Sequence, residues 1–196
     1  FSYLEDIRRI CNQHNWLMML DEVQTGNGRT GKFFAYQHTN IVPDVLTTAK
    51  GLGNGFPIGA VMTQGKAVGL LGAGSHGSTY GGTVLGSRVV YTVLDTLEKE
   101  NAVANAATIG AYIVDQLKAQ LAGYNVQVRG FGMMIGIQLP KDCAELVAIA
   151  RDQYKLIINV TAGSVVRLLP PLNMTQAQAD ELLQRLVPAI QNFLKA

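Results

Sequence analysis

The sequence has 196 residues, of which 48% are hydrophobic and only 15% are charged, whereas an ordinary globular protein has about 25% charged residues. We therefore expect part of the surface to be covered, either by an oligomer interface or by a further stretch of chain. The net charge of +2 arises from 16 basic and 14 acidic residues without a long run of either sign, which argues against nucleic acid or a membrane surface as a partner.

The first half of the chain alternates helix and strand patterns. YLEDIRRICNQHN predicts a helix, because its spacing puts four apolar residues on one face: Leu4, Ile7, Ile10 and Cys11. WLMML then predicts a short strand buried on both faces, and DEVQTGNGRTG is a loop rich in turn-forming residues. DVLTTAK and IGAVMTQ predict two more strands. This order predicts an α/β fold with a mostly parallel sheet, in which ligands bind at the carboxyl ends of strands.

The second half has a different pattern. A long helical stretch is expected from Val84 to Leu121, with an interruption near Asn101. After it, strands are expected at YNVQVRG, MMIGIQL, LIINVTA and VVRLLPP, and a helix at CAELVAIARDQY. An amphipathic helix closes the chain, with Thr175 as its N-cap. We interpret residues 98–196 as a separate small α+β domain, with a boundary near residue 97.

The two cysteines and the lengths of the apolar segments favour the cytoplasm as the cellular compartment. Cys11 and Cys143 are far apart and lack CxxC spacing, so we expect two free buried thiols in a reducing compartment. We see no signal peptide and no apolar stretch long enough to cross a bilayer, and therefore expect a cytoplasmic protein. The chain begins FSYLEDIRRI, without methionine and inside an expected helix, so we also expect it to be a piece of a longer protein.

Lys50 ends the apolar strand DVLTTAK and is followed by Gly51, Gly53 and Gly55. One interpretation is a lysine at a strand end that extends into water. The other is an amine held in a partly dry site beside closely approaching backbone. Burial lowers the pKa of a lysine, and a neutral amine can attack a carbonyl to form a Schiff base.

Asp21 directly follows the apolar run WLMML, and it also has two interpretations. It could cap a turn, or it could pair with a cation that must stay protonated, such as a pyridinium nitrogen. A lysine Schiff base together with an aspartate on the ring nitrogen is the combination that pyridoxal phosphate chemistry requires.

Two further segments suggest contacts with anions. HGSTYGG is either an ordinary flexible loop or a phosphate site, in which Ser78 and Thr79 offer hydroxyls and the glycines let backbone N–H groups approach an anion. Arg167 in VVRLLPPL either bridges a sheet edge or binds a carboxylate through two parallel hydrogen bonds.

Four segments, in this order, resemble the signature segments of the class III, fold-type I, pyridoxal-phosphate-dependent aminotransferases: LMMLDEVQTGNGRTGKFFAYQH, PDVLTTAKGLGNGFPIGAV, HGSTYGG and VVRLLPPLNMT. The string GNGRTG and the spacing are most similar to the acetylornithine aminotransferase branch, which includes succinylornithine and succinyldiaminopimelate activities. The resemblance implies that residues 1–97 are the C-terminal part of the large cofactor-binding domain, and that residues 98–196 are the small C-terminal α+β domain.

The resemblance also implies roles for residues around the cofactor. Lys50 would be the catalytic Schiff-base lysine, which moves a proton between the substrate carbon and the cofactor. Asp21 would be the catalytic partner of the pyridinium nitrogen. Val23 would pack against one face of the ring, and Gln24 would hydrogen-bond near its phenolic oxygen.

The remaining residues that match the family would bind anionic groups of the cofactor or the substrate. Thr79, with Ser78 beside it, would contact the cofactor phosphate of the neighbouring subunit, which implies a homodimer. Arg167 would bind the α-carboxylate of the substrate. The sequence departs from the family after the phosphate loop, where GGTV at residues 81–84 stands in place of GGNP. It also departs in length, because it matches only the second half of the family's enzymes.

The resemblance implies a transaminase of arginine biosynthesis. It would move the terminal amino group of N-acetylornithine, or of a related acylated or ω-amino acid, to 2-oxoglutarate through a lysine-bound pyridoxal 5′-phosphate. No metal, nucleic acid or membrane partner is expected. The alternative is a non-catalytic C-terminal fragment of such an enzyme, folded but lacking the N-terminal half of the active site.

Overall fold

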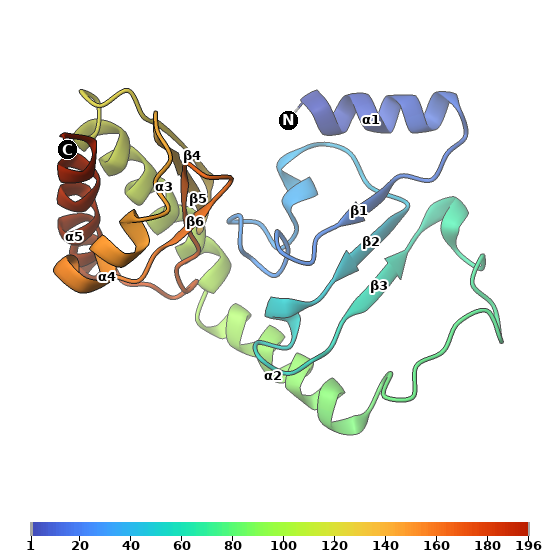
Figure 1. The fold of residues 1–196 in the computed structure, drawn as a ribbon. Helices are drawn as coiled ribbons and strands as arrows, with labels where there is room; N and C mark the ends of the chain where they lie inside the picture. The colour runs from blue at the N-terminus through green and yellow to red at the C-terminus, as the bar shows by residue number, and fades with distance from the viewer. Residues whose placement is uncertain (1, 196) are drawn as a thin grey trace. The chain divides into compact units, whose positions relative to one another are not determined.

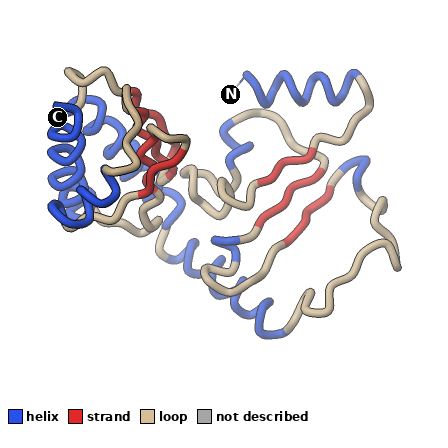
Figure 2. The backbone as a smooth tube through the Cα atoms, in the orientation of Figure 1, coloured by secondary structure: helices blue, strands red, loops and turns tan. Residues whose placement is uncertain are grey.

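The computed structural model describes residues 2–195. The chain forms two compact units, the first extending to Ala102 and the second beginning at Val103 (Figure 1). Both combine helices with a sheet, in agreement with the predicted α/β fold followed by an α+β part (Figure 2). Within the described residues, no helix is both long enough and apolar enough to cross a membrane.

The boundary between the units follows a break between two helices. Residue 97 lies inside α2 (Val84–Lys99), so the boundary expected from the sequence falls within a helix. Asn101 has a φ of 50°, a left-handed conformation that an α-helix cannot accommodate. Helix α3 (Ala102–Gln120) begins directly after it. The predicted interruption of the helical stretch near Asn101 is confirmed, and the chain divides at this interruption.

The first unit is built on a three-stranded sheet in the order β1-β2-β3. Its strands are β1 (Met19–Asp21), β2 (Val45–Thr48) and β3 (Ala60–Thr63). Helix α1 (Ser2–Gln13) precedes the sheet and α2 follows it. Three short 3-10 helices lie in the connections: η1 (Ala35–His38), η2 (Lys50–Leu52) and η3 (Gly65–Ala67). In α1 the four expected apolar residues are buried or half-buried, which confirms the predicted face.

The strand directions differ in part from the expectation. Strands β1 and β2 are parallel, as predicted, but β3 runs antiparallel to β2. The connection explains this difference. Parallel neighbours need a crossover of about a dozen residues or more, usually an α-helix, whereas residues 49–59 contain only η2. The chain therefore turns back along β2.

Strand β1 is less buried than its sequence suggests. Met18, just before it, is 1% exposed, but Met19 is 64% exposed and Asp21 is also exposed. The expectation of a strand buried on both faces is therefore wrong for the described chain, because no described segment covers the Met19 face. Other large apolar side chains of this unit are exposed as well, among them Val61 and Leu70.

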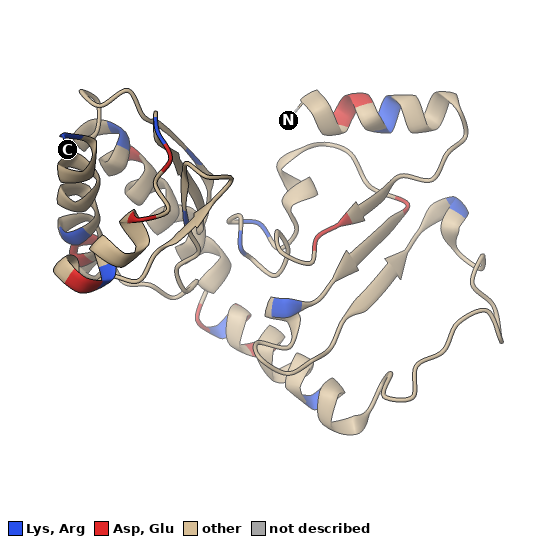
Figure 3. Cartoon of the chain, viewed as in Figure 1, with Lys and Arg blue, Asp and Glu red and all other residues tan. Residues whose placement is uncertain are grey.

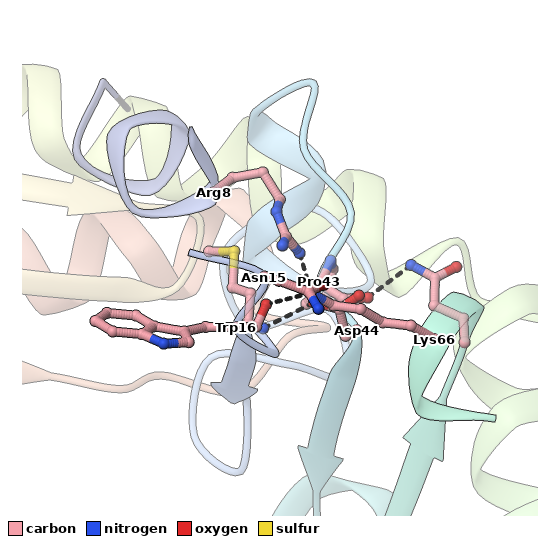
Figure 4. A network of polar contacts seen from close by, with 8 residues as sticks. Arg8, Asn15, Trp16, Pro43, Asp44 and Lys66 are labelled. Carbon is pink, nitrogen blue, oxygen red and sulfur yellow. Dashed lines mark hydrogen bonds and ion pairs between the residues drawn. The ribbon is translucent and has the colours of Figure 1, made fainter. Parts of the chain in front are cut away.

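A polar network at the amino end of β2 ties α1 to the sheet (Figure 4). Arg8 donates from Nη1 to Asp44 Oδ2 at 2.7 Å, and the same oxygen accepts the Met18 N–H at 2.7 Å. Lys66 adds a bond to the Trp16 carbonyl at 2.6 Å. Partial burial opposes ionisation of Asp44, but the Met18 N–H and the Arg8 guanidinium outweigh it, so the pKa of Asp44 is lowered.

We expect Asp44→Asn to lower the free energy of unfolding by about 2 kcal/mol near neutral pH, because it removes a charge from a mostly buried ion pair. The pKa of Asp44 is lower in the folded than in the unfolded state. Its charge therefore contributes stability above the unfolded pKa, and this contribution is lost as the pH falls through the folded pKa. The difference between wild type and variant should shrink below about pH 4. Urea unfolding across this pH range measures it.

Asp6→Asn is the matched control for this prediction. Asp6 pairs with Arg9, but both side chains are about 60% exposed, and such surface pairs contribute less than about 1 kcal/mol. If Asp44→Asn had no larger effect than Asp6→Asn, or the same effect at every pH, the charge of Asp44 would not be stabilising.

The second unit has helices on one face of an antiparallel sheet. The sheet order is β4-β5-β7-β6, with β4 (Gln127–Phe131), β5 (Met134–Gln138), β6 (Asn159–Thr161) and β7 (Val165–Leu168). Helices α3, α4 (Leu146–Tyr154) and α5 (Gln176–Lys195) complete it. Strands β5 and β7 share one hydrophobic core with all three helices, through residues such as Ile137, Val166, Leu117, Leu146 and Ile190.

Two local predictions for the chain are confirmed. Thr175 caps α5, because its Oγ1 accepts the Gln178 N–H at 3.3 Å while Gln178 Oε1 accepts the Thr175 N–H at 2.9 Å. This reciprocal pair is a capping box, which satisfies two backbone donors at the helix start. Cys11 and Cys143 are both free thiols and both buried, and burial raises the pKa of the Cys143 thiol.

Candidate active site

The amine of Lys50 and the carboxylate of Asp21 belong to the end of the first sheet at which the parallel strands β1 and β2 have their carboxyl ends. Asp21 is the last residue of β1 and lies level with Thr47 of β2. Lys50 follows the end of β2. Neighbouring strands lie about 4.8 Å apart, and both side chains are exposed. The parallel pairing therefore puts an amine and a carboxylate at adjacent carboxyl ends, as the strand pattern predicts.

The backbone at Lys50 is held in an uncommon conformation. Its φ is 46°, in the left-handed region, which costs a non-glycine residue roughly 1–2 kcal/mol. The Lys50 carbonyl accepts the Gly53 N–H at 3.1 Å and the Asn54 N–H at 3.0 Å. At Gly53 a side chain cannot fit, because a Cβ there would lie 2.1 Å from the Phe56 carbonyl oxygen. The glycines after Lys50 thus permit a tight turn.

Lys50 lines an open pocket of about 450 Å³ in the first unit. Its other lining residues are Ala49 and Gly55 to Gly59. Phe56, Pro57 and Ile58 give this wall an apolar character next to the amine. Such a pocket can receive a flat apolar ring whose reactive group faces the lysine.

Asp21 caps a turn with one of its oxygens. Its Oδ1 accepts the Val23 N–H at 2.9 Å, which is the turn-capping role considered for this residue. This contact involves one carboxylate oxygen, so capping the turn and pairing with a cation are compatible. Val23 and Gln24 follow within the same turn and are half-buried.

Glu22 was not singled out from the sequence, yet it organises the loop after β1. It is only 3% exposed, and it accepts hydrogen bonds from Thr25 Oγ1 at 2.7 Å, Ala35 N at 2.7 Å and Tyr36 N at 2.8 Å. The alternation of side chains after a strand turns Glu22 inward where Asp21 is exposed. In the sequence, only the adjacent acidic residues Asp21 and Glu22 at the strand end indicated that one carboxylate is exposed and the other organises the loop.

Ser78 and Thr79 are exposed and lie in the loop between η3 and α2. A turn closes at this point, because the Ser78 carbonyl accepts the Gly81 N–H at 3.2 Å. No described contact connects these two hydroxyls with Lys50. The departure GGTV has a local consequence, since Thr83 is the N-cap of α2 and accepts the Gly86 N–H at 3.4 Å. The helix therefore begins at Val84 without the family's proline.

Arg167 lies on β7 with its side chain on the face opposite the core. Its neighbours Val166 and Leu168 are buried in that core, and strand alternation turns Arg167 to the other side. Among residues 2–195, its buried Nε has no hydrogen-bond partner. The edge-bridging interpretation is wrong, because β7 lies between β5 and β6. A half-buried guanidinium with an unsatisfied donor can bind a carboxylate.

Lys and Arg are interspersed with Asp and Glu in both units (Figure 3). The chemistry available is local: one amine and one carboxylate at adjacent strand ends in the first unit, and Arg167 with its unsatisfied Nε in the second unit. The amine and the carboxylate of the first unit fit a ligand that carries an aldehyde and a protonated ring nitrogen, and the arginine of the second unit fits a carboxylate.

Comparisons with known proteins identify relatives across almost the whole chain. The family model for the class-III aminotransferases matches residues 1–190. The acetylornithine aminotransferase of Nitrosomonas europaea is 47% identical over 197 residues, covering 100% of this chain and 50% of the relative. That of Aquifex aeolicus is 41% identical over 93% of this chain and 47% of the relative. The chain therefore spans about half the length of the curated relatives it matches.

Solved structures of aminotransferases also match almost the whole of this chain and about half of their own length. An ornithine aminotransferase from Plasmodium yoelii has a TM-score of 0.91 at 33% identity, over 98% of this chain and 52% of that one. An acetylornithine aminotransferase from Elizabethkingia anophelis has a TM-score of 0.89 at 30% identity, over 97% of this chain and 49% of that one.

Proposed function

This chain belongs to the class-III aminotransferases, a family that depends on pyridoxal phosphate, and we propose that it contributes the catalytic lysine of a transaminase. The proposed reaction moves the terminal amino group of N-acetylornithine, or of a related acylated or ω-amino acid, to 2-oxoglutarate. The parallel pairing of β1 and β2 carries this proposal, because it brings Asp21 and Lys50 to one sheet edge.

The proposed roles follow from the chemistry of these side chains. Pyridoxal phosphate, when bound, supplies an aldehyde and a ring that withdraws electrons from the substrate. Lys50 would hold the cofactor through Nζ, and its amine can take and return the substrate proton as a general base and acid. Asp21 would keep a proton on the ring nitrogen by charge pairing. Val23 would pack against the ring, and Gln24 would hydrogen-bond beside its phenolic oxygen.

Three further residues have proposed roles in binding the phosphate of the cofactor and the carboxylate of the substrate. Ser78 and Thr79 lie in an exposed loop, and we propose that they bind the cofactor phosphate of a neighbouring subunit in a homodimer. Arg167 would bind the α-carboxylate of the substrate through its guanidinium. Its unsatisfied buried Nε supports this role, since a bound carboxylate would supply the missing acceptor.

The proposal is tested on the intact protein by steady-state kinetics with three amino donors. Acetylornithine, succinylornithine and 4-aminobutyrate are compared with 2-oxoglutarate as acceptor, and glutamate formation is measured. We expect turnover with acylated ornithines and visible absorbance from cofactor bound to lysine. A protein that binds pyridoxal phosphate but transfers no amino group from any of the three would contradict the proposed substrate class.

Arg167→Lys should raise the KM for the substrate whose α-carboxylate it binds by more than about tenfold, because lysine cannot form the bidentate contact. The kcat should change less, since the carboxylate is bound in both the ground state and the transition state. Arg151→Lys is the control. Arg151 is exposed on α4 and pairs only with its neighbour Asp152 among the described residues. Equal KM values for wild type and Arg167→Lys would disprove the carboxylate role.

The alternative is that the 196-residue chain folds without catalysing transamination, as a fragment of such an enzyme. The coverage of about half of each relative motivates it. Intact mass of the protein purified from its own cells, combined with the glutamate assay, separates the two. Activity at the 196-residue mass would exclude this alternative.

A further inference from the structure

Asn27 supports the backbone segment that carries Lys50. Its side chain is 4% exposed, and its Nδ2 donates to Thr48 Oγ1 at 2.9 Å and to the Ala49 carbonyl at 3.1 Å. Thr48 is the last residue of β2, and Ala49 directly precedes Lys50. The amide therefore holds the peptide group that joins Ala49 to Lys50.

The same side chain packs against the residue after Lys50. A Cβ added to Gly51 would lie 3.2 Å from the Cβ of Asn27, which is closer than ordinary van der Waals contact. Asn27 therefore bonds to the backbone before Lys50 and leaves little room for a side chain at the residue after it. A substitution of Asn27 therefore alters the contacts that hold the turn around Lys50.

The orientation of the Asn27 amide is fixed by its acceptors. With the amide flipped, Oδ1 would face the Ala49 carbonyl oxygen, and two acceptors would repel each other. In the observed orientation Oδ1 is buried, and within residues 2–195 it has no hydrogen-bond partner. An unsatisfied buried acceptor costs about 1–3 kcal/mol. Glycine would tolerate the Asn27 φ of 56° without that cost, so stability alone does not account for asparagine here.

We propose that Asn27 is a positioning residue for Lys50: it fixes the Ala49–Lys50 peptide in the left-handed turn and thereby directs the ε-amino group. This inference rests on the proposed function, in which Lys50 binds the cofactor and moves the substrate proton. A residue that acts through the orientation of Lys50 affects proton transfer more than substrate binding. It therefore acts on kcat more than on KM.

Two substitutions test the role of the amide donor in the intact holoenzyme. Asn27→Asp keeps the shape and Asn27→Gly removes the side chain, and both tolerate a left-handed backbone. For both, we expect kcat to fall about tenfold, the effect of losing the hydrogen bond to the Ala49 carbonyl, with KM within about twofold. The pH midpoint of the visible absorbance of lysine-bound cofactor should also shift. Asn101→Asp and Asn101→Gly are controls at a second left-handed asparagine, which is exposed, and should change neither.

Borohydride reduction followed by peptide mass spectrometry separates this inference from the proposed function. If the unsubstituted protein carries no cofactor on Lys50, the proposed function is wrong, and this inference with it. If the cofactor is on Lys50, but both Asn27 variants lower only the thermal midpoint and leave kcat and the absorbance midpoint unchanged, Asn27 is structural and the positioning role is wrong.

Discussion

Lys50→Ala in the intact protein should lower kcat by about a thousandfold or more and remove the visible absorbance of lysine-bound cofactor. In the proposed function, the variant lacks both the amine that would bind the aldehyde and the group that would move the substrate proton, and general acid–base catalysis alone contributes about 10²–10⁴-fold. Folding should be little affected, because Lys50 is exposed and its backbone carbonyl makes the hydrogen bonds of the turn. Transaminase assays and absorbance spectra of both proteins measure the effect.

Lys118→Ala is the matched control for this prediction. Lys118 is an exposed lysine of α3 in the second unit, so its removal should leave kcat and the spectrum unchanged. A small primary amine added to Lys50→Ala should restore part of the proton transfer, because the pocket beside Lys50 is open. If Lys50→Ala kept the visible absorbance, another residue would bind the cofactor, and the proposed site would be wrong.

The positions of the two strand-end residues follow from simple sequence patterns. An apolar run that ends in a polar residue marks the carboxyl end of a strand, and both Asp21 and Lys50 follow such runs. Parallel strands bring their carboxyl ends to the same edge, so the pairing of β1 with β2 joins the two patterns. The arrangement was predictable because each pattern is local and the pairing rule is general.

Other features depend on contacts that no local pattern contains. An apolar run has no direction, so IGAVMTQ predicts a strand without indicating that β3 is antiparallel to β2. Asn27 stands in a glycine-rich loop and resembles an ordinary turn residue. Its role depends on a contact with Ala49, a residue distant in the sequence. The burial of Glu22 likewise depends on the loop folding back to Ala35 and Tyr36.

The close approach of α3 to the β4–β5 turn also cannot be predicted from the sequence. Gly110 lies within α3, where glycine is usually about 1 kcal/mol less favourable than alanine. A Cβ at Gly110 would lie 2.0 Å from the Gly132 carbonyl oxygen and 2.3 Å from its carbonyl carbon. Because Gly132 has a φ of 53°, the turn that presents this carbonyl is itself constrained. The helix can pack at this distance only with glycine at position 110.

Gly110→Ala should therefore destabilise the second unit by about 3 kcal/mol, because α3 must move away from the turn and its buried contacts, such as that of Ile113, are disturbed. Urea unfolding followed by circular dichroism measures this free energy. Gly123→Ala is the control, since a Cβ there would meet nothing within 4 Å. Helix propensity alone predicts the opposite sign for Gly110→Ala, a gain of about 1 kcal/mol. A stabilised variant would thus show that α3 and the turn do not pack as closely as the structure indicates.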